Sequence, residues 1–494
     1  MRIRVVPTAS KKYAVQVVSK RYGKLTVHKH VGTYSNASEK VKLFKQAKAY
    51  IAGITQQGNL LELLSSWRPS EIAITESHPL LLYQLLSRVY DKLGLDAYGD
   101  ALIKDLVIAR IYRPASKRET REVLSDVFGK QWPLITIYRH LKRAINSGLK
   151  DTFQKALIDF TRDELQDSLQ LVFYDVTTLY FESVVKADIQ GFEFSKDHRS
   201  SETQSVVCLV VNRQGFPLYF DVFRGRTFEG HTFSSVVQNI KKLLSNPDLV
   251  VVADAAMLSQ ANIDDLIQHQ IGFIVGARIA NLPSQLIEQI AEGLKGQDGK
   301  TITVGYRKQR LICQYLQKRA AKDRSEREKQ ITKAQEIINA PSEKIRRYRF
   351  IKATGQTVAL NTELIAKAEK LEGIKGYITN TQLAEPIVIE RYHDLWRIEY
   401  AFRLTKSDLE ARPVFHRLDE TIQAHLVIVF AGLAICKYLE IKTGMSIHRV
   451  LKLAEKVLTH KVTNMRTGES AFIETTIEDP ELKAKIELLK SLGH

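Results

Sequence analysis

The hydrophobic and polar positions change their period along the chain, and each change marks a predicted region. Residues 1 to about 34 alternate in three short runs, RIRVV, YAVQVVSK and LTVHKHVGTY, with the period of β-strands. Residues 78–165 follow a mostly helical period instead. We therefore predict a β-rich N-terminal region over residues 1–75 and a helical region over residues 76–165.

Two helices of the second region carry capping signals. Ser116 can cap a helix that Gly129 ends, and Thr136 can cap the next helix, TIYRHLKRAI, of which it is the first residue. The second of these helices has an apolar stripe and a basic face: Ile137, Leu141 and Ile145 on one side, and Arg139, Lys142 and Arg143 on the other. The pair resembles a helix-turn-helix that would suit a DNA groove. A helical bundle with a solvated basic face is the alternative.

From Leu169 the pattern becomes that of an α/β domain. LQLVFYDVTTLYF reads as a strand, SVVCLVV and FPLYFDVF as a hairpin around NRQG, and DLVVVADA and GFIVGA as strands that follow helices. A hairpin followed by right-handed crossovers gives a mixed five-stranded α/β sheet. We predict that this core covers residues 166–279 and 380–445.

Residues 280–379 break this rhythm, so we predict an insertion domain there. The segment holds the strand-like runs KTITVGY and RLICQYL and a charged helix, RAAKDRSEREKQITKAQEII. After the core, residues 446–494 are predicted to be helical. The apolar run His425–Leu439 is too short to span a bilayer and ends in charged residues, which predicts a buried helix.

Charge and cysteine content narrow the function classes. The 494 residues include 73 Lys and Arg against 55 Asp and Glu, a formal net charge of +18. That excess favours a polyanionic partner, although ribosome-associated and membrane-surface proteins share it. The three cysteines are far apart without a CxxC pair, which argues against a disulfide framework or zinc site. We expect a cytoplasmic protein, since MRIRVVPTASKK has no signal-peptide character.

Two aspartates stand where a buried strand ends or is interrupted. Asp175 lies within FYDVTT, and Asp254 ends VVVAD. A carboxylate in such a place is costly unless it is paired or binds metal, and strand ends are where α/β sheets bind ligands. Each residue alone could equally be a capping or turn aspartate. On the first and fourth strands of a ribonuclease-H-like sheet, however, they would be neighbours.

A later segment places an acid, bases and aromatic residues at helical spacing. The spacings of four, three, four and three predict one helix face that carries Tyr392, Trp396, Glu399, Arg403 and Lys406. Such a face could ligate metal through the acid, neutralise phosphates through the bases and support a base or sugar on a ring. The alternative is two core aromatic residues and an ion pair of Glu399 with Arg403.

These residues resemble a known family. Tyr392-x6-Glu399-x6-Lys406, within YHDLWRIEYAFRLTKSDLEARPVFH, is similar to the Y-R-E-K signature of the DDE transposases of bacterial insertion sequences. FYDVTTLYFE, GFEFSKDHRS and VVADAAM resemble the segments around the first two acids of the family, and the likeness runs from about residue 165 to 440. The signature has arginine where this chain has Leu395, so Arg397 or Arg403 would take that role.

The resemblance implies a ribonuclease-H-like catalytic core with a β-rich insertion before the glutamate. It also implies two Mg²⁺ ions, with Mn²⁺ as a substitute, held by Asp175, Asp254 and Glu399. DNA contacts are implied for the other residues of the signature segment, and His198 and Arg199 could approach DNA or form a solvated loop. The residues that we predict to contact DNA are Tyr392, Trp396, Arg397, Arg403, Lys406, His198 and Arg199.

The implied function is cut-and-paste transposition. The protein would cut double-stranded DNA at terminal inverted repeats and join the ends to target DNA, as a homodimer without a membrane partner, in the bacterial cytoplasm at the nucleoid. Two alternatives stay open: a ribonuclease-H-like nuclease without strand transfer, and a domesticated DNA-binding protein that has lost its activity.

Overall fold

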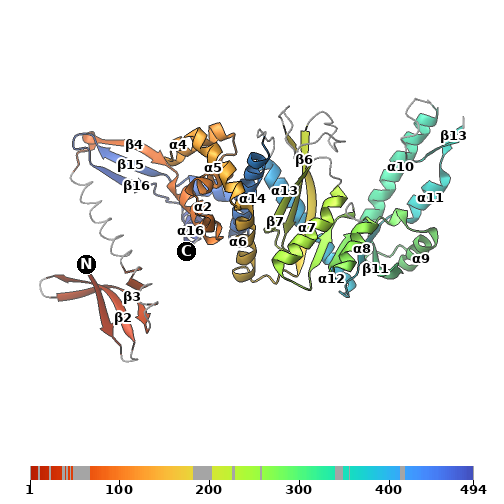
Figure 1. The fold of residues 1–494 in the computed structure, drawn as a ribbon, viewed down its shortest axis with the longest axis horizontal. Coiled ribbons are helices and arrows are strands. Elements are labelled where there is room, and N and C mark those ends of the chain that lie inside the picture. Colours follow the sequence, from red (N-terminus) through yellow and green to blue (C-terminus); the bar gives the residue numbers. More distant parts are fainter. Residues whose placement is uncertain are drawn as a thin grey trace. The chain divides into compact units, whose positions relative to one another are not determined.

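The computed structural model contains two compact units (Figure 1). One consists of Met1–Pro79 with Val457–Thr476, and the other of Leu80–Lys456 with Ile477–His494. The structure describes residues 2–8, 12–21, 24–35, 39, 43–44, 46–47, 67–181, 203–224, 229–255, 259–339, 349–354, 357–411 and 418–492.

The smaller unit has two antiparallel sheets of three strands each. The first, in the order β1-β2-β3, comprises β1 (Arg2–Pro7), β2 (Tyr13–Arg21) and β3 (Lys24–Tyr34). The second, in the order β16-β15-β4, comprises β4 (Ile72–His78), β15 (Thr459–Asn464) and β16 (Ser470–Glu474). The predicted N-terminal strands are thus confirmed. The hairpin of β15 and β16, by contrast, lies in residues 446–494, for which we predicted helices.

The larger unit begins with a helical region. Its helices are α2 (Leu80–Lys92), α3 (Ala101–Tyr112), α4 (Lys117–Phe128), α5 (Leu134–Asn146) and α6 (Leu149–Asp163). Ser116 caps α4 and Gly129 ends it, as predicted. Helix α5 begins two residues before the predicted cap Thr136, because Pro133 already has the cap geometry and its carbonyl accepts the amide of Thr136 at 2.9 Å.

Helix α14 (Asp419–Thr443) is the central helix of this unit. It is apolar on all sides, and α2, α3, α5 and α6 pack against it, as do α13 and β7. The helix is longer than the apolar run that predicted it. By length and composition it could cross a membrane, but 94% of its most apolar window is buried inside the protein. Helices α15 (Ile447–Glu455) and α16 (Pro480–Ser491) complete the unit.

An eight-stranded sheet forms the α/β core, in the order β10-β11-β14-β9-β8-β5-β6-β7. The predicted core strands are β5 (Leu171–Phe181), β6 (Thr203–Val211), β7 (Pro217–Arg224), β8 (Val250–Ala253) and β9 (Gly272–Gly276). Strands β5, β8 and β9 are parallel, whereas β6 and β7 are antiparallel. Helices α7 (Glu229–Leu244) and α8 (Gln260–Gln268) provide the crossovers. This order confirms the mixed ribonuclease-H-like core.

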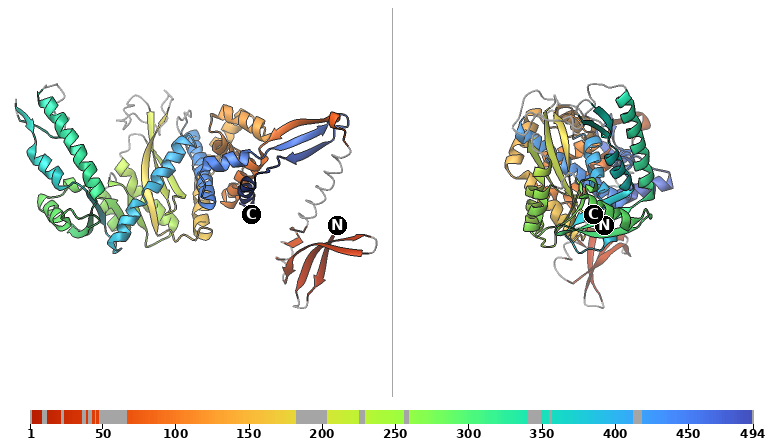
Figure 2. Two further views of the ribbon diagram at one scale, coloured as in Figure 1. Left: turned by 180° about the vertical axis from the view of Figure 1, so that it is seen from behind. Right: turned by 90° about the vertical axis from the view of Figure 1, so that its right-hand side faces the viewer.

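Residues 280–379 extend this sheet and add a helical arm. Strands β10 (Thr301–Tyr306), β11 (Gln309–Tyr315) and β14 (Ile374–Thr379) continue the sheet beyond β9, which removes β9 from its edge. Helices α9 (Ser284–Leu294), α10 (Gln317–Asn339) and α11 (Thr362–Lys370) alternate with these strands. The hairpin of β12 (Ile351–Thr354) and β13 (Thr357–Leu360) lies along α10 (Figure 2). The insertion is therefore mixed α/β and shares a sheet with the core.

The segment predicted as one helix around Glu399 is divided in two. Helix α12 (Glu385–His393) ends at Asp394, and α13 (Trp396–Ser407) starts after Leu395. Between them the amides of Leu395 and Arg397 bond to carbonyls three residues earlier, which tightens the turn. The prediction that Tyr392 shares one helix with Glu399 was therefore wrong, because residue spacing does not reveal a local tightening.

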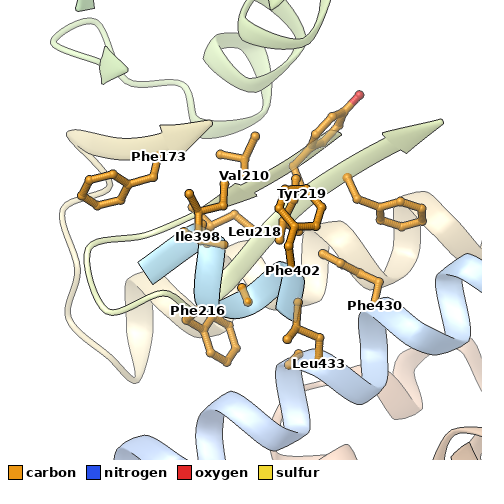
Figure 3. Close-up of a cluster of buried hydrophobic side chains, with 14 of the residues drawn as sticks. Phe173, Val210, Phe216, Leu218, Tyr219, Ile398, Phe402, Phe430 and Leu433 are labelled. Atoms are coloured by element: carbon orange, nitrogen blue, oxygen red, sulfur yellow. The ribbon is translucent and has the colours of Figure 1, made fainter. Parts of the chain in front are cut away.

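The core lies between the sheet and helices α13 and α14. Ile398 and Phe402 of α13 and Phe430 and Leu433 of α14 face the strands (Figure 3). The cluster drawn there also includes Phe173 of β5, Val210 of β6, Leu218 and Tyr219 of β7, and Phe216, which directly precedes β7. This packing fixes α13 over one face of β5 and β6.

Candidate active site

Asp175 and Asp254 are placed by two neighbouring parallel strands. Pairing of β5 with β8 keeps an offset of 79 residues (250 − 171 = 79) from Leu171 with Val250 onward. The last pair of the two strands is Tyr174 with Ala253. One residue further along, the same offset places Asp175 beside Asp254 (254 − 175 = 79). Adjacent strands are separated by about 4.8 Å. The predicted proximity of these strands is therefore confirmed.

Glu399 lies on helix α13, which packs over the same face of the sheet. Side chains alternate along β5, so Asp175 shares a face with Phe173 and Thr177. Phe173 lies in one buried cluster with Phe402 of α13 (Figure 3), and Thr177 lines a cavity with Phe402. Glu399 stands in the first turn of that helix and is exposed. The three acids thus gather on the α13 side of β5 and β8.

Tyr392 reaches Asp254 over a glycine. Its hydroxyl donates a hydrogen bond to Oδ1 of Asp254 at 3.3 Å. The ring is only 8% exposed, and burial, followed by the charge of Asp254, raises the pKa of the phenol, which therefore stays a donor. Pairing of β8 with β9, extended by one residue, places Gly276 beside Asp254. A Cβ added at Gly276 would stand 2.4 Å from the hydroxyl oxygen of Tyr392, so only glycine leaves room for this contact.

Asp254 is held by one of its oxygens. Oδ1 accepts the hydroxyl of Tyr392 and also the backbone amide of Ala255, at 2.6 Å. In the described part of the chain, Oδ2 accepts no hydrogen bond and neither oxygen pairs with Lys or Arg. The carboxylate is therefore oriented while one oxygen stays available to a ligand.

Lys375 of β14 brings a cation to the same place. Its Nζ lies 4.9 Å from the ring centroid of Tyr392 and 5.7 Å from that of Tyr377. Burial and then the nearby charge of Arg319 lower the pKa of Lys375, while the charges of Asp254 and Glu399 act to raise it. Both acids are therefore close enough to attract the ammonium group.

The arginines of α13 differ in their surroundings. Arg397 pairs with Asp394 at 3.2 Å and stacks on Trp396 with its Cζ 5.0 Å from the ring centroid. Arg403 is exposed and lies over the ring of Tyr400, 5.0 Å from the centroid. Arg403 therefore has an open guanidinium face, whereas an ion pair orients Arg397.

The remaining predicted residues occupy varied places. Trp396 is 53% exposed at the start of α13, and Lys406 is half-buried in its last turn. Leu395, where the signature has arginine, is only 7% exposed. His198 and Arg199 lie outside the described residues.

The three acids fit a hard divalent cation in their chemistry. Carboxylate oxygens are the ligands that Mg²⁺ prefers, and Asp254 and Glu399 are both exposed. Among the residues that the structure describes, however, no three His, Cys, Asp or Glu side chains lie close enough to hold a metal ion. The backbone therefore brings the ligands to one face, and their side chains do not converge in this structure.

Sequence reasoning missed Lys375 and Gly276. Lys375 stands between Ile374 and Gly376 in an otherwise apolar strand, and an exposed edge lysine is the common explanation of such a pattern. Its position beside Asp254 depends on β14 joining β9, a pairing between strands nearly a hundred residues apart. The one available signal was a glycine in each of these two strands, Gly276 in β9 and Gly376 in β14, since glycine in a strand marks a close approach.

Comparison with known proteins agrees with this arrangement. A family model described as the transposase DDE domain matches residues 166–435, more than half of the chain. No curated protein sequence matches the chain. Among solved structures, it is similar to a piggyBac transposase synaptic complex with hairpin DNA, with 9% identity and a TM-score of 0.40 over 77% of this chain and 79% of that chain.

A second solved structure, the Mos1 mariner paired end complex with Mn, has 14% identity and a TM-score of 0.15 over 27% of this chain and 42% of that chain. Because both TM-scores are low, the assignment rests on the family model, which spans the strands and helices that carry Asp175, Asp254 and Glu399. The chain belongs to the transposases with a DDE domain.

Proposed function

We propose that this transposase cuts DNA at the ends of its own mobile element and joins them to target DNA, with Asp175, Asp254 and Glu399 as the catalytic acids. The observation that carries this assignment is the constant offset of β5 and β8, which sets the two aspartates side by side beneath the helix of Glu399. Two carboxylates on adjacent strands would be placed to hold a metal ion between them.

A DDE transposase uses divalent metal ions, and we assign two Mg²⁺ ions to this site. When bound, they would supply an activated water or DNA 3′-hydroxyl and stabilise the leaving oxygen. The chain's own residues orient the ligands: Tyr392 fixes Oδ1 of Asp254, and Glu399 is exposed, so its side chain is free to turn toward the aspartates.

DNA positioning is assigned to the exposed side of α13. Arg403 presents its guanidinium above Tyr400, and Tyr400 donates its hydroxyl to Glu440 at 2.7 Å. Trp396 is exposed four residues earlier, where its ring could support a base or sugar. Trp396, Arg403 and Lys406 form a row along α13 that passes Glu399 and runs toward the C-terminus of the helix.

Recognition of the element ends is assigned to α5 and to the N-terminal sheet. Arg139, Lys142 and Arg143 are exposed on α5, on the side away from the buried Ile137 and Leu141. In the first sheet, Arg4, Gln16 and His30 stand opposite one another across three strands. Residues 1–38 contain no Asp or Glu, which suits a surface that binds phosphates. Pairing of two ends implies two copies of the chain in the active complex. The cytoplasmic location stays a prediction.

The test is cleavage of a supercoiled plasmid that carries the DNA flanking the gene. We expect Mg²⁺-dependent nicking and joined products from the natural protein, and neither from Asp175→Asn, Asp254→Asn or Glu399→Gln. Asp248→Asn, at the other end of β8, and Glu390→Gln, an exposed acid of α12, are the matched controls that should stay active.

The outcomes separate the alternatives. Nicking that survives in any of the three acid variants removes that residue from the triad. Cleavage without joined products indicates a nuclease without strand transfer, and DNA binding without metal-dependent cleavage indicates a domesticated binding protein.

A further inference from the structure

The position that carries arginine in the signature cannot supply a cation here. Leu395 is 7% exposed and belongs to the main hydrophobic cluster. The nearest arginines are engaged elsewhere. Arg397 pairs with Asp394 at 3.2 Å, and Arg391 pairs with Glu390 at 3.1 Å and with Asp394 at 3.6 Å. A phosphate beside Asp254 therefore needs another counter-charge.

Lys375 occupies the appropriate place. The side chain of Lys375 projects from the same face of β14 as that of Tyr377, two residues later. The ring of Tyr377 packs against the ring of Tyr392, so Lys375 faces Tyr392 as well. The rings of Tyr392 and Tyr377 flank its side chain, which limits the directions that the ammonium group can take. The charges of Asp254 and Glu399 attract the group, whereas that of Arg319 repels it. The contacts with the two rings thus orient the lysine.

The surroundings leave room for DNA next to this lysine. Lys375, Tyr392 and Ala255, the residue after Asp254, line an open cavity of about 340 Å³. Three other cations line it: Arg327 pairs with Glu372 at 2.7 Å, Arg319 pairs with Asp323 at 3.4 Å, and Arg349 lies over the ring of Phe350 with its Cζ 5.2 Å from the centroid. No Asp or Glu lies within ion-pair distance of Lys375 among the described residues.

We propose that Lys375 binds the DNA phosphate that lies nearest to Asp254 and Glu399, in the role for which the signature uses arginine. This assignment rests on the proposed function. Without DNA the ammonium group lies over the rings of Tyr392 and Tyr377. When a phosphate enters between this group and the two acids, it gives the ammonium group a charge-assisted hydrogen bond in place of a longer-range attraction.

The test uses the full-length chain without divalent metal, bound to duplex DNA from the flank of the gene. We expect Lys375→Met to weaken binding about tenfold, the loss of one hydrogen bond to a charged group. The slope of log affinity against log salt should fall by about one. Lys375→Arg should retain most of the affinity. Lys370→Met is the control, because Lys370 is an exposed lysine of α11 that pairs with Glu288 at 3.1 Å.

A neutral methylphosphonate at the cleaved position identifies the phosphate concerned. It should weaken binding of the natural protein but not of Lys375→Met, because the two changes remove the same contact. Equal weakening of both proteins would overturn the proposal, as would an unchanged affinity and salt slope for Lys375→Met. In that case Lys375 is only a counter-ion of the acids.

Folding and the proposed function are checked separately. If Lys375→Met unfolds at lower urea concentration than the natural protein, Lys375→Gln, which keeps a polar side chain, replaces it in the same assays. A natural protein that binds the duplex but does not cleave it would contradict the proposed function and leave the phosphate contact decided by the methylphosphonate experiment. Cleavage by the natural protein with no binding defect in either variant would contradict the role of Lys375 alone.

Discussion

The phenolic hydroxyl of Tyr392 donates to Oδ1 of Asp254 at 3.3 Å, from a helix that follows the aspartate by 138 positions in the chain. The donor is buried and the acceptor is exposed, so the contact fixes the carboxylate from the protein side and leaves its other side to solvent. A tyrosine that we expected to touch DNA is thereby attached to a predicted metal ligand.

Replacement of Gly276 by alanine should disturb that contact. The new Cβ would stand 2.4 Å from the hydroxyl oxygen and 3.1 Å from Cζ of Tyr392, so the ring has to move. We expect the free energy of unfolding to fall by about 1–3 kcal/mol, as for other overpacked sites, and metal-dependent cleavage to weaken. Urea unfolding and plasmid cleavage measure the two effects. Gly305→Ala is the control, because nothing lies within 4 Å of a Cβ at that strand position.

Tyr392→Phe isolates the hydrogen bond from the packing. Groups that orient a metal ligand typically change metal affinity by about 10–100-fold, so we expect the Mg²⁺ concentration at half-maximal cleavage to rise about tenfold. Calorimetric titration with Mn²⁺ should show the same shift in the absence of DNA. Tyr377→Phe, which removes a hydroxyl bonded to His393 at 3.2 Å, should leave the metal dependence unchanged. An unaltered half-maximal concentration in Tyr392→Phe would contradict the orienting role.

The local part of this site follows from the sequence. The apolar runs around Asp175 and Asp254 predict strands. That these two strands are neighbours was expected for a ribonuclease-H-like sheet, and β5 and β8 do pair in the observed order β9-β8-β5-β6-β7. Residue period was sufficient for the strands themselves.

What the sequence does not reveal depends on contacts between distant segments. Lys375 reaches the acids only because β14 pairs with β9, and no local pattern specifies that pairing. The break between α12 and α13 is equally invisible, since Tyr392 and Glu399 keep helical spacing across it. The hydroxyl of Tyr392 can reach Asp254 only because Gly276 has no Cβ in its way.

Glu372→Gln should weaken the ion pairs that join α10 to the segment before β14. Glu372 is 8% exposed and accepts from Nε of Arg327 at 2.7 Å and from Nε of Arg324 at 3.2 Å. The side chain of Arg327 is 13% exposed, so removal of the carboxylate charge leaves a largely buried cation with only the exposed Glu369, 3.9 Å away, as an acidic partner. We expect the free energy of unfolding to fall by about 3 kcal/mol.

Urea unfolding tests this loss, and Glu288→Gln is its control because Glu288 makes an exposed pair with Lys370, of a kind worth about 0–1 kcal/mol. Glu372 lies three residues before Lys375, so the variant should also weaken DNA binding. Equal unfolding midpoints for the two variants would show that the Arg327 pair adds no stability.

Leu395→Arg should harm the protein, although it restores the arginine of the signature. The side chain at this position is 7% exposed and belongs to the main hydrophobic cluster. A guanidinium there would be buried without a partner, and we expect a loss of several kcal/mol in the free energy of unfolding. Leu488→Arg, at a 40% exposed position of α16, should change stability by less than about 0.5 kcal/mol. If Leu395→Arg instead stays as stable as the natural protein and binds DNA more tightly, then α13 can turn this position outward, and the cation that the signature requires would come from the helix and not from Lys375.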